Sequence, residues 1–185
     1  MKQLAGVFLV TLVVAGPASA ASAASAVSRP CRIPGGDTVA RNSIAKLIAV
    51  PTPDGAALFA CIRRDGRKIA LDDGYSDARL AGRWVAWQRP GRPRHWRIAV
   101  HDLRTGDERL VDGHVAAHSL ALTTRGSIVW ADRLDADPRT PLFANELHKR
   151  GRLLDGGDVD PTSVKVRGRR VTWFSSDVEH SATVR

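Results

Sequence analysis

Short apolar runs, each ending at a turn dipeptide, recur along residues 38–185. They are rich in Val, Ile, Leu, Phe and Trp, and they end at pairs such as Asp-Gly or Thr-Gly, which provide the positive φ that tight hairpin turns need. Apolar and polar positions alternate in residues 98–103, as expected of a strand with one buried face. No segment after the amino-terminal one has the periodicity of an amphipathic helix. The pattern predicts an all-β fold of short antiparallel strands.

The runs belong to a longer repeat. Trp87, Trp130 and Trp173 are separated by 43 residues in both intervals, and each closes a short apolar strand. A second landmark, Leu-x-Asp-Gly, recurs at residues 71–74, 110–113 and 153–156. A repeat of about 43 residues with about four strands has the size of a propeller blade. Because the tryptophan recurs in each repeat, we expect it in the core rather than in a ligand site.

Two turns give the repeat a family likeness. Residues 98–106 (IAVHDLRTG) match the pattern I-x-V-x-D-L-x-T-G, residues 142–151 match it loosely, and residues 52–55 (TPDG) are similar to a Ser-Pro-Asp-Gly turn. Over about residues 38–185 the chain therefore resembles the secreted TolB-type propeller repeats, which are related to the WD-repeat blades. The resemblance implies a β-propeller-like array of about four antiparallel blades, the last incomplete. It implies no active site, because such propellers serve both binding proteins and enzymes.

The expected organisation is a signal peptide at residues 1–20, a flexible lead-in at 21–37, and blades at about 38–76, 77–118, 119–163 and 164–185. The last repeat contains the Trp173 strand and the start of another, and it lacks the remaining turn and strand. Residues 44–50 are expected either as the inner strand of the first repeat or as a strand that completes the last. Closure into a small ring with that strand, dimerisation through open strand edges and a truncated chain all stay open.

The amino-terminal segment predicts export. Lys2 precedes an apolar run at residues 4–14, Gly16 and Pro17 interrupt it, and the small residues 18–20 offer a cleavage site. This order is typical of a secretory signal, and the run is too short for a transmembrane anchor. We expect a secreted or extracytoplasmic protein.

The two cysteines fit that compartment. Cys31 and Cys61 both remain after cleavage, and an even count in an exported chain favours a disulfide. The bond would close a loop of about 30 residues and stabilise the fold by roughly 3–4 kcal/mol.

A net charge of +9 at pH 7, to which arginine contributes most of the positive charge, predicts a basic surface. Either it reflects a compositional bias towards arginine, or it attracts a protein or an anionic cell-envelope polymer. Nucleic acid is a poor match for an exported chain. Residues 88–96 (QRPGRPRHW) combine arginine with an aromatic side chain, which suits carboxylate, phosphate or sugar-ring contacts. The candidate binding residues are Arg89, Arg92, Arg94, His95 and Trp96. A solvated hairpin is the alternative.

Catalytic signals are weak. No Gly-x-Ser-x-Gly elbow is present, His114 and His118 lie outside any expected helix, and Asp132, Asp135 and Asp137 suit a hairpin turn. We predict no catalytic residue, metal site or cofactor. The preferred function is an exported, non-catalytic, β-propeller-like binding or interaction module. The alternative is a hydrolase or lyase whose acidic residues converge from the blade loops.

Overall fold

The computed structural model describes residues 32–53, 55–90, 96–116, 118–132, 139–147 and 150–185. This part of the chain consists of β-strands in four antiparallel sheets and one short 3-10 helix, η1 (Pro161–Ser163). The expected all-β fold is therefore confirmed. The expected signal peptide, residues 1–20, lies outside the described residues. Within them, no helix is long and apolar enough to cross a membrane.

Each sheet is a meander in which the strands pair in chain order. The first sheet contains β1 (Asp37–Arg41), β2 (Ala45–Thr52), β3 (Gly55–Ile62) and β4 (Lys68–Asp72). The second contains β5 (Ser76–Ala81), β6 (Trp84–Pro90), β7 (Trp96–Asp102) and β8 (Glu108–Asp112). The third contains β9 (Ala121–Leu122), β10 (Ile128–Ala131), β11 (Leu142–Asn145) and β12 (Arg152–Asp155). The fourth has three strands, β13 (Lys165–Arg167), β14 (Arg170–Ser175) and β15 (Val178–Thr183).

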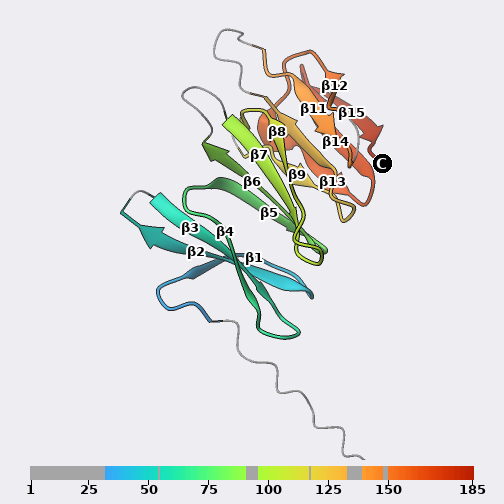
Figure 1. Cartoon of the computed structure of the whole chain (residues 1–185). Helices are drawn as coiled ribbons and strands as arrows, with labels where there is room; N and C mark the ends of the chain where they lie inside the picture. The colour runs from blue at the N-terminus through green and yellow to red at the C-terminus, as the bar shows by residue number, and fades with distance from the viewer. Residues whose placement is uncertain (1–31, 54, 91–95, 117, 133–138, 148–149) are drawn as a thin grey trace, which may run out of the picture.

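The four sheets follow one another through the molecule in chain order (Figure 1). Their first strands are neighbours, since β1 contacts β5, β5 contacts β9 and β9 contacts β13. Three apolar clusters fill the spaces between consecutive sheets. One joins the first and second sheets around Leu47 and Trp87, the next joins the second and third around Ile98 and Trp130, and the last joins the third and fourth around Leu142 and Trp173. Burial of these faces holds the stack together.

The repeated tryptophans are core residues, as predicted. Trp87, Trp130 and Trp173 lie on the second strand of the second, third and fourth sheets and are almost fully buried. The indole Nε1 of Trp87 donates a hydrogen bond to Asp72 at 2.8 Å, and that of Trp173 donates to Asp155 at 2.7 Å. Both aspartates are the last residue of the preceding sheet. At these two sheet interfaces, an aspartate at the end of one sheet therefore binds the repeated tryptophan of the next sheet.

The middle interface departs from this arrangement. Trp130 Nε1 donates to Asp132 of its own sheet at 3.4 Å, and Asp112 points to solvent, where it pairs with Arg97. Gly113 lies so close to the Trp130 ring that a Cβ there would come within 2.7 Å of Nε1. Like Asp72 and Asp155, Asp112 is the last residue of the fourth strand of its sheet, but it does not contact the tryptophan of the next sheet.

Residues 44–50 do not complete the last repeat. They lie mainly in β2, which pairs with β1 and with β3, the latter in continuous register from Ala45↔Ile62 to Thr52↔Gly55. A short turn joins β2 to β3, so this local pairing has a small loop-closure cost, whereas pairing with the fourth sheet would have to close a long loop. The expectation of a completing strand is corrected accordingly.

The meander gives every sheet the same two ends. At one end lie the turns between first and second strands and between third and fourth strands. At the other lie the turns between second and third strands and the links to the next sheet. These ends coincide from sheet to sheet: Asn42 donates to the carbonyl of Gly82 at 2.8 Å, and Ser127 donates to that of Arg185 at 2.5 Å. The molecule therefore has two ends, and all four sheets contribute to each.

Candidate functional site

The loop singled out by sequence is only partly described. Arg92, Arg94 and His95 lie outside the described residues. Trp96 begins β7, and its ring stacks on that of His114, with 5.1 Å between the ring centroids and 11° between the planes. The aromatic member of the loop is thus packed on the link that follows β8.

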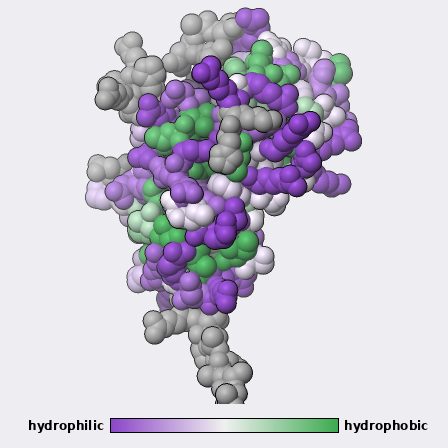
Figure 2. Space-filling view, turned by 45° about the vertical axis from the view of Figure 1, so that its right-hand side comes forward, coloured by the Kyte–Doolittle hydropathy of each residue, from purple (hydrophilic) through white to green (hydrophobic). Residues whose placement is uncertain are grey.

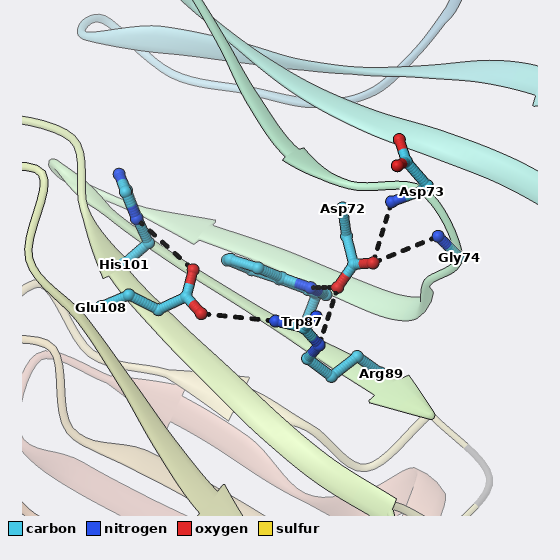
Figure 3. A network of polar contacts seen from close by, with 7 residues as sticks. All are labelled: Asp72, Asp73, Gly74, Trp87, Arg89, His101 and Glu108. Carbon is cyan, nitrogen blue, oxygen red and sulfur yellow. Dashed lines mark hydrogen bonds and ion pairs between the residues drawn. The ribbon is translucent and has the colours of Figure 1, made fainter. Parts of the chain in front are cut away.

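Arg89 belongs to a network of polar contacts between the first two sheets (Figure 3). Its Nε lies 3.1 Å from Asp72 Oδ2, and its Nη1 lies 3.4 Å from Glu108 Oε1. The other oxygen of Asp72 accepts the backbone N–H groups of Asp73 and Gly74. Two carboxylates therefore compensate the Arg89 charge, which gives this arginine a structural role between the sheets.

The predicted disulfide stays a prediction. Cys61 is fully buried on β3, and Cys31 lies outside the described residues.

Acidic side chains gather at the end that carries the sheet-to-sheet links, and most of them serve their own turns. Asp155 accepts the Gly157 N–H, and Asp160 accepts the Thr162 N–H and hydroxyl. In the part of the chain that the structure describes, no group of three or more His, Cys, Asp or Glu side chains is placed to hold a metal ion.

Asp77 is the exception at that end. It lies at a bulge of β5 in the left-handed region (φ 48°), and it faces His118, which is also left-handed (φ 63°). Its carboxylate pairs with Arg79 and is 5% exposed, and the His118 ring is open to solvent. Burial raises the pKa of the Asp77 carboxyl despite the opposing effects of Arg79, His118 and the Leu120 N–H. This end of the molecule therefore places a buried carboxylate with a left-handed backbone beside an exposed imidazole.

The opposite end carries a different site. A cleft of about 810 Å³ opens between the first and second sheets at the turns that follow β1, β3, β5 and β7. The arginines that line it are Arg63, Arg64, Arg67, Arg83 and Arg104. Between them lie the apolar side chains of Ile44, Ile62 and Leu103. We call this cleft, defined by these eight residues and Ser43, the arginine cleft.

Most of the positive charge in the arginine cleft is uncompensated. Arg83 is the cleft arginine with an acidic partner among the described residues, at 3.0 Å from Asp102. Arg63 and Arg67 donate to the carbonyl oxygens of Asn42 and Leu103, which accept hydrogen bonds without neutralising the charge.

Two further cleft arginines are the most available. Arg64 and Arg104 are exposed, and no described residue forms an ion pair or hydrogen bond with either side chain. The cleft can therefore offer free guanidinium groups to an oxyanion, which a planar guanidinium binds with two parallel hydrogen bonds.

Sequence reasoning missed this cleft although its signal is in the chain. Arg63, Arg64 and Arg67 surround the Asp65-Gly66 turn, and Arg83 and Arg104 flank repeat landmarks. Each arginine appears unremarkable in an arginine-rich chain. Only the stacking of two sheets brings these turns together.

Comparison with known proteins finds no family model, no curated protein and no solved structure that matches the chain. What is established is an all-β fold of four small antiparallel sheets.

Proposed function

We propose that this protein is an exported, non-catalytic binding module and that its ligand is an anionic molecule held in the arginine cleft. The observation that carries the proposal is the excess of guanidinium groups in one cleft. Five arginines line it, and Asp102 is the carboxylate that pairs with one of them among the described residues. A concave, low-dielectric wall concentrates the field of such charges and favours anions over neutral ligands.

The apolar members of the cleft narrow the ligand class. Ile44 is 41% exposed and lies beside Ile62 and Leu103, so the cleft offers aliphatic contacts between its charges. An anion with a carbon framework, such as an acidic glycan or a wall polymer, satisfies both parts of the surface. This partner class also agrees with export, which the amino-terminal segment predicts.

The arrangement of the sheets supports a propeller-like architecture of the TolB type. Four antiparallel meanders with neighbouring first strands, and an aspartate that holds the tryptophan of the next repeat, are features of a blade array. Blade arrays commonly bind ligands at the turns of one end, where each blade contributes side chains.

The test is retention on phosphocellulose at about physiological ionic strength, where long-range attraction between exposed charges is largely screened. The variant Arg64→Gln/Arg104→Gln removes two free charges of the cleft and is expected to elute at lower salt than the wild type. The matched control, Arg97→Gln/Lys165→Gln, removes the same charge at the opposite end and is expected to elute with the wild type. If both variants elute at equally reduced salt, retention depends on the net charge of the protein and not on the cleft, and the proposal is overturned.

The alternative, a hydrolase or lyase, has one observation in its favour, the contact of Asp77 with His118. The same polyanions distinguish the two functions. A binding module leaves the chain length of polyphosphate or polygalacturonate unchanged. Shortening of either polymer by the wild type, abolished in Asp77→Asn and retained in Arg64→Gln/Arg104→Gln, would assign catalysis to the Asp77 end instead.

A further inference from the structure

The arginine cleft is one part of a longer feature. At the same end of the molecule, arginines occur at the turns of all four sheets. They are Arg63, Arg64, Arg67, Arg83, Arg104, Arg125, Arg150, Arg152, Arg169 and Arg185. We call this set the arginine rim. Figure 2 turns the right-hand side of Figure 1 towards the viewer and shows hydrophilic residues around smaller apolar patches on that face.

Each sheet interface opens into a groove along the rim. The arginine cleft lies between the first and second sheets. A second groove of about 380 Å³ lies between the second and third sheets, and a third of about 330 Å³ lies between the third and fourth. Arg83 and Arg104 line both the cleft and the second groove, so the row of charges is continuous there. The third groove is lined by Arg150, Arg152 and Arg185.

The carboxylates of the rim divide it into two basic sites. The second groove contains Asp102, Asp107 and Glu108 beside its three arginines, Arg83, Arg104 and Arg109, and is electrically mixed. The third groove contains Glu146, which lies 3.7 Å from Arg152. Arg150 and Arg185 are exposed, and no described residue pairs with their guanidinium groups. Arg64 and Arg104 therefore give the cleft free positive charge, and Arg150 and Arg185 give it to the third groove.

We infer that the rim binds a linear polyanion that engages the arginine cleft and the third groove together. The inference rests on the proposed function and adds the ligand's shape to it. The two sites are separated by two sheet spacings, on the order of 20 Å for sheets stacked about 10 Å apart. A small anion reaches one site only. A polymer with a phosphate or carboxylate on each repeat unit reaches both, and the second contact is then intramolecular.

Chain length is the variable that tests this inference. The short probe is tripolyphosphate, and the long probes are polyphosphate and polygalacturonate chains that exceed the distance between the two sites. Wild-type protein is expected to bind the long chains at least about tenfold more tightly than the short probe at equal concentration of anionic groups, because two linked sites produce avidity. The affinity for the long chain is also expected to fall more steeply with salt, since more counterions are released.

Two variants separate the sites. Arg150→Gln/Arg185→Gln is expected to bind tripolyphosphate with nearly wild-type affinity at the cleft and to lose the gain from chain length. Arg64→Gln/Arg104→Gln is expected to bind both the short and the long probes more weakly. The control Arg97→Gln/Lys165→Gln is expected to leave the ratio of the two affinities unchanged. Binding of either long polymer supports the inference, and comparison of the two assigns the oxyanion.

Two results overturn the inference in distinguishable ways. If the short probe depends on Arg64 and Arg104 but the long chains gain nothing, the proposed function stands and the two-site polymer is wrong. If no polyanion binds with dependence on the cleft, both fail. If Arg150→Gln/Arg185→Gln still binds the long chains more tightly than tripolyphosphate, the third groove is not the other site that the polymer engages.

Discussion

The two ends of this molecule use charge in opposite ways. At the end with the sheet-to-sheet links, three carboxylates are engaged within the protein: Asp72 and Asp155 accept hydrogen bonds from tryptophans, and Asp160 caps a turn. At the other end the guanidinium groups of Arg64 and Arg104 face solvent without an ion-pair partner among the described residues. Arg89 shows that this fold can compensate an arginine, because Asp72 and Glu108 both face it.

The difference separates structural charge from functional charge. A buried polar group left without its partner costs about 1–3 kcal/mol, so the contacts of Asp72 are required for the fold. An exposed arginine with no partner contributes little to stability and lies ready for a ligand. Net charge alone does not distinguish the two cases, since the arginines of both ends count equally towards the +9 of the chain.

The largest expected effect comes from the structural end. Asp72→Ala leaves the Trp87 indole N–H, the Nε of Arg89 and two turn N–H groups without their acceptor. We expect a loss of about 3 kcal/mol in the free energy of unfolding, because breaking a largely buried pair costs more than the pair contributes. Urea unfolding followed by tryptophan fluorescence measures it.

The repeat supplies the matched control. Asp112 ends the fourth strand of the second sheet as Asp72 ends that of the first, is 88% exposed, and pairs among the described residues with the exposed Arg97. Asp112→Ala is expected to change the free energy of unfolding by less than about 0.5 kcal/mol. Equal losses in the two variants would show that the aspartate acts through the turn itself and not through Trp87.

A smaller effect is expected at Asp77, and it depends on pH. Burial raises the pKa of this carboxyl in the folded state, so the folded protein binds the proton more tightly than the unfolded chain. The Asp77 carboxyl contributes most to the free energy of unfolding below its unfolded pKa of about 3.9. This contribution is lost as pH rises through the raised pKa of the folded state. Asn does not titrate, so Asp77→Asn does not lose stability in this way. The free energy of unfolding of the variant, relative to that of wild type, should therefore increase as pH rises from the unfolded to the folded pKa of Asp77.

Equilibrium unfolding at several pH values tests the sign. Asn is the suitable replacement because it tolerates the left-handed backbone that residue 77 adopts. If the difference between variant and wild type were independent of pH over that window, the Asp77 carboxyl would not be titrating as its burial requires.

The fold was largely predictable because its signals are local. The tryptophan that recurs every 43 residues marks the repeat. Glycine turns such as Thr105-Gly106 mark the hairpins, and Gly106 adopts the positive φ (84°) that such a turn needs. The pairing of residues 44–50 was harder to predict, because an apolar pattern indicates a strand but not which other strand it pairs with. The continuous pairing of β2 with β3, as far as Thr52 opposite Gly55, shows which partner it has.

The arginine cleft was not predictable in the same way. Its members come from turns about 40 residues apart, and no local pattern links Arg64 to Arg104. The loop at residues 88–96 stood out because its charges are consecutive, although its Arg89 proves to be compensated by two carboxylates. Local density of charge identifies a basic segment, whereas freedom from an internal partner depends on tertiary contacts.

The smallest expected effect is the stability of the cleft variant. Arg64→Gln/Arg104→Gln removes two exposed guanidinium groups that have no ion-pair partner among the described residues, so its free energy of unfolding should differ from that of wild type by less than about 0.5 kcal/mol. At low ionic strength the variant should be slightly more stable, because the cleft arginines repel one another there, and the difference should vanish as salt screens that repulsion. Urea midpoints at low and physiological salt measure the stability difference between variant and wild type and its dependence on salt. A salt-independent loss of more than about 1 kcal/mol would place Arg64 and Arg104 with Arg89, among the charges that hold the sheets together, and would remove the basis for treating the cleft as a ligand site.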